Sequence, residues 1–195
     1  MPPRRDAGQA FPIYITVVAG LLFLALAYLA VGQASVNRSG AQTAADAAAL
    51  ASAQDVRDQL AAQWVKALPD PKKWQDIFDG RATLDDDPCV RAGQLAARND
   101  ALLNGCSPQG LLKYRVDVRT NKSVGRSVVP GSENYKSRAS ATAEIQPLCT
   151  FPPDEGAGGD ALPELTCNGK VWHLKPDDTT GLPKPEDLFD VHLAD

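Results

Sequence analysis

One stretch constrains this chain more than any other: residues 11–32 carry no charged side chain and are almost entirely apolar. As an α-helix, about 22 residues extend roughly 33 Å, enough to cross the hydrocarbon core of a bilayer. The following segment is strongly biased to alanine, the best helix former, and has no proline before Pro69. The sequence therefore predicts one long helix whose first half lies in lipid and whose second half projects into water.

This helix divides the chain into four parts. We expect a cytoplasmic N-terminus at residues 1–10, a transmembrane helix at 11–32, an alanine-rich helical extension at 33–68 and an extracytoplasmic head at 69–195. Within the head, residues 150–166 are rich in Pro, Gly and acidic side chains and are predicted to form a mobile loop.

Basic residues indicate the orientation of the span. Arg4 and Arg5 precede it, and Arg38 alone follows closely on the other side, which places the N-terminus in the cytoplasm of a single-pass membrane protein. The apolar core is longer than that of a secretory signal, which favours a retained anchor. Cleavage near residues 25–27 or 32–34, which contain small side chains, is the alternative.

Small residues recur every four positions along the helix. Ala30 and Ala34 form such a pair near the outer end of the span, and the spacing continues at Ala41, Ala45, Ala49 and Ala53. A row of this kind lets another backbone approach closely, although helix propensity alone explains it equally well. Asp46 interrupts the alanine-rich run, either as a solvated side chain or as a registry contact with a partner helix. Both interpretations leave open a homo-oligomer formed through the helix.

The end of the extension has a different apolar pattern. Four large side chains spaced by four residues make one stripe, formed by Val56, Leu60, Trp64 and Leu68. We expect this stripe to bury itself against the head, and Pro69 to help end the helix.

A second helix is predicted at residues 88–103. Asp87 suits its N-cap, Pro88 its first position, and Asn104-Gly105 its stop. Asn99 lies on its apolar face, where we expect a structural hydrogen bond rather than a catalytic role.

The hydrophobic period then changes from 3.6 to 2. Alternation at residues 112–119 and 138–145 predicts two half-buried strands that pair as an antiparallel hairpin, and residues 170–174 and 188–193 are weaker strand candidates, the last at an edge. The expected fold is therefore α+β: a long N-terminal transmembrane helix continuing into a small head of one or two helices packed on a small, largely antiparallel sheet.

All four cysteines follow the apolar segment, as expected for disulfides in an oxidising compartment. Cys149–Cys167 is the favoured bridge. Cys89–Cys106 requires a helix shorter or more bent than 88–103, because the ends of that helix would lie about 20 Å apart. Pairing Cys106 with Cys149 and Cys89 with Cys167 stays open.

No motif of a known chemistry is present. The chain lacks a glycine-rich phosphate loop, a G-x-S-x-G elbow and an H-E-x-x-H pair, and its only histidines are His173 and His192. We therefore expect no enzyme, no metal site and no cofactor. The net charge of −4 also argues against a nucleic-acid partner. After Cys149, ten acidic residues against three lysines make an acidic tail, which is usually a solvated surface.

Two short stretches resemble a known family. DAGQ at residues 6–9, before the apolar span, and QTAADAAALA at 42–51, after it, look like the N-terminal module of Tad (tight adherence, Flp pilus) assembly proteins, closest to the TadG-like group and its actinobacterial members. The resemblance covers roughly residues 4–55. Related pseudopilins carry a Gly followed five residues later by Glu, whereas Gly8 here is followed by Ile13, so processing into a fibre is not expected.

The resemblance implies a membrane-anchored, non-enzymatic component of a Tad/Flp-type pilus assembly or surface secretion apparatus. Its partners would be the lipid bilayer and other pilus-assembly or secretion membrane proteins. The alternative is a surface domain, an adhesin or sensor or less readily a hydrolase, that is anchored or released by signal cleavage.

Overall fold

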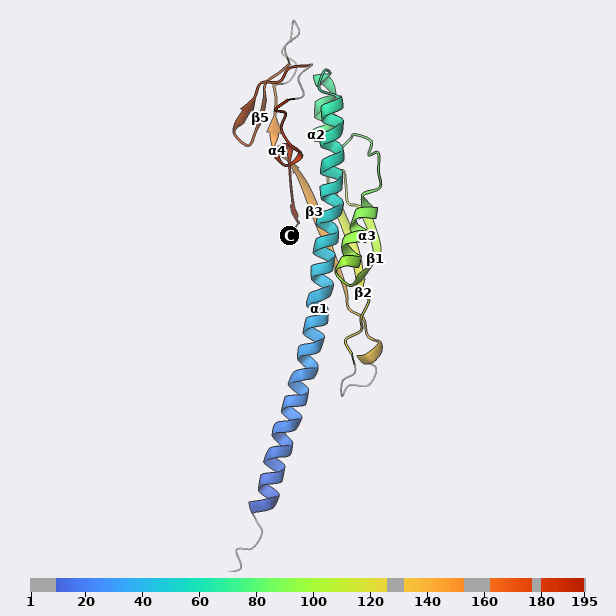
Figure 1. The fold of residues 1–195 in the computed structure, drawn as a ribbon, viewed down its shortest axis with the longest axis vertical. Coiled ribbons are helices and arrows are strands. Elements are labelled where there is room, and N and C mark those ends of the chain that lie inside the picture. Colours follow the sequence, from blue (N-terminus) through green and yellow to red (C-terminus); the bar gives the residue numbers. More distant parts are fainter. Residues whose placement is uncertain (1–9, 126–131, 153–161, 177–179, 195) are drawn as a thin grey trace, which may run out of the picture.

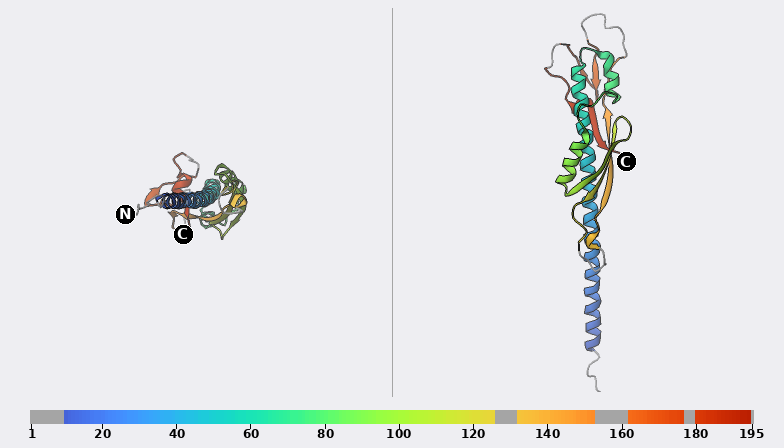
Figure 2. Two further views of the ribbon diagram at one scale, coloured as in Figure 1. Left: turned by 90° about the horizontal axis from the view of Figure 1, so that it is seen from below. Right: turned by 90° about the vertical axis from the view of Figure 1, so that its right-hand side faces the viewer.

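One continuous helix, α1 (Ala10–Lys66), forms the spine of the protein (Figure 1). The computed structural model describes residues 10–125, 132–152, 162–176 and 180–194. The remaining helices are short: η1 (Pro71–Lys73), α2 (Trp74–Phe78), α3 (Pro88–Arg98), η2 (Ser132–Asn134) and α4 (Pro185–Leu188). Figure 2 shows the head gathered around the C-terminal part of α1, while the N-terminal part extends beyond it. The fold is α+β, as the sequence predicts.

The strands form two antiparallel sheets. Four of them pair in the order β1-β2-β3-β7, with bounds β1 (Ala101–Pro108), β2 (Lys113–Thr120), β3 (Arg138–Pro147) and β7 (Phe189–Leu193). The smaller sheet has the order β4-β5-β6, with bounds β4 (Cys149–Thr150), β5 (Leu165–Cys167) and β6 (Lys170–Trp172). The predicted hairpin of two alternating strands is β2 paired with β3, and β7 is an edge strand as expected.

The four-stranded sheet lies on α1 through complementary side-chain sizes. On β2, Tyr114, Val116 and Val118 face the core, and on β3 each is paired with an alanine: Ala143, Ala141 and Ala139. The face of α1 beneath the sheet is also small, with fully buried alanines at Ala41, Ala44, Ala45, Ala48, Ala49 and Ala53. Small side chains on both elements let their backbones approach closely, so the sheet can follow the helix without a gap.

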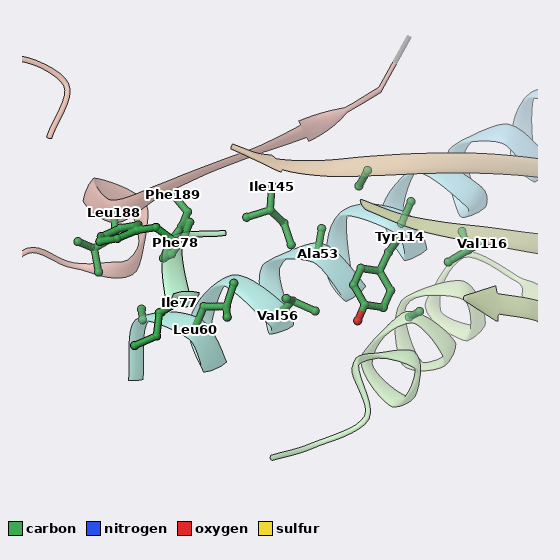
Figure 3. Packing of buried hydrophobic residues seen from close by; sticks show 14 of the residues in the cluster. Ala53, Val56, Leu60, Ile77, Phe78, Tyr114, Val116, Ile145, Leu188 and Phe189 are labelled. Carbon is green, nitrogen blue, oxygen red and sulfur yellow. The ribbon is translucent and has the colours of Figure 1, made fainter. Parts of the chain in front are cut away.

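Larger side chains close the other end of the core, where Figure 3 shows Phe78, Leu188 and Phe189 close together. The rings of Trp64 and Trp74 lie 5.5 Å apart, and Phe78 lies 5.2 Å from Phe189. Phe151 contacts both Trp74 and Phe78, at 5.5 and 5.7 Å between ring centroids. This aromatic cluster joins the end of α1 to α2, to β7 and to the residue after β4.

The structure ends the second helix earlier than the sequence predicts. α3 begins at Pro88 with Asp87 as its N-cap, as expected, but ends at Arg98 with Asn99 as its C-cap rather than at residue 103. Asp100 then adopts a positive φ of 54°, which reverses the chain into β1. Asn104 and Gly105, expected as the helix stop, lie inside β1, where the register shifts between Leu103 and Gly105.

This reversal resolves the disulfide pairing. It brings Cys106 beside Cys89, with 5.8 Å between their Cα atoms, and the two form a bridge. Cys149 bridges Cys167, its direct partner across β4 and β5, as favoured from the sequence. Pairing Cys106 with Cys149 and Cys89 with Cys167 was therefore wrong.

The predicted acidic loop and the predicted strand that follows it differ from the structure at their ends. Residues 153–161, the centre of the predicted mobile acidic loop 150–166, lie outside the described residues. Its end at Leu165 is not a loop, because this residue belongs to β5 and is fully buried. The strand predicted at 170–174 is β6, which joins the smaller sheet and ends at Trp172.

Replacing Trp64 by Asp should destabilise the head by about 3 kcal/mol or more, because it removes a buried ring and places a carboxylate in the core. The measurement is urea unfolding of the detergent-solubilised full chain. Gln54→Asp is the matched control, since Gln54 is exposed on the same helix and the substitution should cost no more than about 0.5 kcal/mol. Equal midpoints for the two variants would contradict the packing.

Removing either bridge should also cost stability. The bridged residues are separated by 17 and 18 positions, and closing loops of about this length stabilises a fold by about 3 kcal/mol. We expect non-reducing peptide mapping to recover only these two pairs, and the Cys149→Ala/Cys167→Ala variant to unfold at lower urea than the unmodified chain. A mapped peptide joining Cys89 to Cys167 would contradict the structure.

Candidate functional site: the bare helix and its junction with the head

The N-terminal half of α1 is uncovered by the rest of the chain. Its large apolar side chains are exposed all round the helix; Phe11, Phe23 and Tyr28, for example, are at least 70% exposed. Within the described residues, α1 is the one helix long and apolar enough to cross a membrane. Exposed apolar surface of this extent is unfavourable in water, and a helix satisfies its own backbone hydrogen bonds in lipid.

The head first meets α1 directly after this apolar stretch. Asn37 lies at the junction, where its side-chain amide donates to the carbonyl of Lys122 and its Oδ1 accepts from the backbone N–H of Ser137, each at 3.3 Å. The Thr120 hydroxyl also reaches Asn37 Oδ1, at 3.3 Å. One polar side chain of the helix thus ties together the end of β2 and the segment that leads into β3.

The contact extends one further turn toward the membrane segment. Gly125 has a positive φ of 95°, and a side-chain carbon added there would lie 3.9 Å from Oε1 of Gln33. Gln33 is the first residue after the predicted span. The base of the head therefore reaches the point where the apolar helix ends (Figure 1), while residues 33–36 and 38–40 remain exposed.

The small residues predicted to pack against another helix divide into two groups. Ala41, Ala45, Ala49 and Ala53 are fully buried by the chain's own head, in the part of α1 that packs against the sheet and α3. Ala30 and Ala34 lie below the head, and Ala34 is exposed. Asp46 is half-buried and accepts a 2.8 Å hydrogen bond from the amide of Gln42 on the same helix. A contact with a partner helix thus remains a prediction for Ala30 and Ala34.

The four residues of the predicted head-docking stripe lie together in the core. Leu60 and Trp64 are fully buried, and Val56 and Leu68 are 1% exposed. They belong to one hydrophobic cluster with other large side chains at the C-terminal end of α1, including Trp74. The sequence did not indicate Asn37, because a single polar residue after a membrane span gives no sign of the strands that it will meet.

Ionisable side chains do not form a recognisable catalytic arrangement in the described residues. His173 and His192 are exposed, each beside one carboxylate, at 3.2 Å from Glu164 and 3.0 Å from Asp190. Burial raises the pKa of the Tyr114 hydroxyl, and the negative charge of Asp87 adds to the effect. The main features of this region are therefore a helix long and apolar enough to cross a membrane and its direct continuation into a folded head.

Comparison with known proteins finds a family model that is similar to part of this chain. Residues 8–55 match a family model described as "Putative Flp pilus-assembly TadE/G-like". The match contains the apolar segment, the junction and most of the alanine-rich face beneath the sheet, and it ends immediately before Val56. Neither a curated protein nor a solved structure matches the chain.

Replacing Asn37 by Ala should loosen the base of the head from α1, because it removes a donor from the Lys122 carbonyl and one of the two acceptors of the Ser137 N–H, the other being the Thr120 hydroxyl at 3.1 Å. With about 1 kcal/mol per hydrogen bond, we expect amide exchange at Ser137 to accelerate by roughly fivefold or more. Hydrogen exchange of the full chain in detergent measures this. Val36→Ala, at an exposed neighbouring position, should leave the rate unchanged.

Proposed function

We propose that this chain, whose residues 8–55 form a TadE/G-like Flp pilus-assembly segment, is a membrane-anchored and non-enzymatic component of a Tad/Flp-type pilus assembly or surface secretion apparatus. Residues 11–32 cross the membrane once, residues 1–10 lie in the cytoplasm, and residues 33–68 carry the head on the extracytoplasmic side. Its partners are lipid and other membrane proteins of the apparatus, and the similarity to actinobacterial members remains a prediction.

The observation that supports this proposal most is the continuity of α1. One unbroken helix carries the apolar segment and the alanine face that holds the sheet, and the family match spans both. A head fixed to a membrane helix in this way suits a component that must hold a set height above the bilayer while neighbouring proteins assemble beside it. The two disulfides suit an extracytoplasmic head.

A helix–helix contact through Ala30 and Ala34 belongs to the same proposal. These are the small residues of the row that the head leaves uncovered, and they lie near the outer end of the span. Such spacing permits close approach of a second helix, from another copy of this chain or from another membrane protein of the apparatus.

Deleting the gene should abolish surface pili or secretion through the apparatus, and restoring the full chain should recover them. A second complementing version replaces residues 11–32 by a cleavable signal, so that the head is exported but not anchored. We expect it to fail, because the anchor sets the place of the head. Electron microscopy of the cell surface and quantification of secreted protein measure the outcome.

Two controls make this experiment decisive. Non-reducing peptide mapping must show that the released head contains Cys149–Cys167, so that its failure is not misfolding. The full chain should remain in membranes washed with alkaline carbonate. Unchanged pili and secretion in the deletion strain would reject the assembly role and favour the adhesin or sensor, whereas a full chain trimmed near Ala34 and found in the medium would reject the anchor.

A further inference from the structure

A polar hollow lies at the base of the head, between α1 and the beginning of β3. Its volume is about 420 Å³, and its lining is Ser35, Arg38, Ser39, Gln42, Arg138 and Ala139. The helix contributes one arginine and the strand contributes the other, although the two residues are 100 positions apart in the sequence. The fold therefore brings two guanidinium groups to one small surface.

Among the described residues, neither arginine of the hollow has an acidic partner, in contrast to three other arginines of the head. Arg57, Arg81 and Arg115 each form an ion pair with an aspartate. In the part of the chain that the structure describes, neither Arg38 nor Arg138 is ion-paired or hydrogen-bonded through its side chain, and both are exposed. Their donors and the hydroxyls of Ser35 and Ser39 are available to an anion.

The one acidic side chain nearby along the helix is already engaged. Asp46 lies one turn beyond Gln42, accepts a hydrogen bond from its amide at 2.8 Å, and does not line the hollow. The donor set that remains suits a phosphate, because the planar fork of an arginine matches phosphate oxygens in charge and in geometry.

The position of the hollow along α1 identifies the source of that phosphate. Arg38 follows the last residue of the apolar segment, Gly32, by six positions, or about 9 Å along the helix axis. Helical side chains lean toward the N-terminus, which brings the Arg38 guanidinium closer to the membrane, and the headgroup layer on each side is about 5–7 Å thick. The hollow would thus open at the level of lipid headgroups.

Other side chains at the base of the head suit the same surroundings. Tyr135 is 64% exposed, and Lys136 beside it is exposed. The carbonyl of Tyr135 accepts a hydrogen bond from the N–H of Val124, the residue before Gly125, which lies near Gln33. Exposed tyrosines and basic residues favour the membrane–water interface.

We propose that this hollow binds the phosphate of an anionic phospholipid in the leaflet from which the head rises. The inference rests on the membrane anchor proposed above. Arg38 on the helix and Arg138 on the sheet donate hydrogen bonds to the phosphate. The hydroxyls of Ser35 and Ser39 are further donors. A bound lipid at this point fixes the rotation of the head relative to the bilayer, because the site faces only one side of α1.

The test measures lipid binding to the detergent-solubilised full chain by native mass spectrometry. Phosphatidylglycerol and phosphatidylcholine are titrated separately, and inorganic phosphate is then added as a competitor. We expect one molecule of phosphatidylglycerol to bind per chain in preference to phosphatidylcholine. Arg38→Gln/Arg138→Gln should weaken its binding about 30-fold, because each basic side chain at a lipid surface contributes about fivefold.

A matched variant separates the site from net charge. Arg91→Gln/Arg98→Gln removes two exposed arginines of α3, changes the charge equally, and should bind phosphatidylglycerol like the unmodified chain. A third variant, Arg38→Lys/Arg138→Lys, keeps the charge without the forked donors and should bind more weakly than the unmodified chain but better than the glutamine pair. Equal unfolding midpoints establish that all three variants are folded.

Three results would overturn the proposal. The first is that the Arg91/Arg98 and Arg38/Arg138 glutamine variants weaken phosphatidylglycerol binding equally. The second is that the chain shows no preference for phosphatidylglycerol over phosphatidylcholine. The third is that an equimolar amount of inorganic phosphate displaces the lipid, which would identify a soluble anion as the ligand. Because this experiment uses purified protein, its failure leaves the anchor intact. Release of the chain from washed membranes would reject the anchor whatever the lipid result.

Discussion

The structure depends on one helix that remains unbroken from a bare apolar segment to an alanine-rich segment covered by the head. An α-helix satisfies its own backbone hydrogen bonds, so it can pass from an apolar medium into water without a change of backbone geometry. Only the side chains of α1 change, from an apolar surface exposed all round to a row of alanines buried beneath a sheet. The height of every element of the head above the apolar segment follows from its position along this helix.

Two kinds of packing hold the head to the helix. The alanines of α1 and of β3 allow the helix and the sheet to approach closely. Each alanine buries little apolar surface, so this contact depends more on the close fit of the two backbones than on the apolar area that it buries. The aromatic cluster at the end of α1 supplies the larger burial, and Leu60 continues it toward the sheet. Strands as short as β4 and β5 are marginal by themselves, and the bridge between them compensates.

The lower end of the head relies on polar contacts. Asn37 joins α1 to the residues that end β2 and lead into β3, and it does so where the apolar segment has just ended. Hydrogen bonds at the surface of a protein contribute less than buried apolar area, but they are directional. The contact therefore sets the register between helix and sheet, and the same register places Arg138 beside Arg38 in the polar hollow.

The sequence by itself determined the long helix, the class of the fold, the β2–β3 hairpin and the favoured Cys149–Cys167 bridge. The helix and the hairpin rest on local signals, composition and a period of two, and together they indicate the class of the fold. The strand β1 could not be predicted, because Leu102 and Leu103 also fit the period of a continuing helix and only the turn at Asp100 decides between them. Cys89–Cys106 depended on that same turn. Tertiary structure likewise decided the junction at Asn37 and the presence of Arg38 and Arg138 in one hollow. Residues 100 positions apart come together only when the sheet packs against the helix.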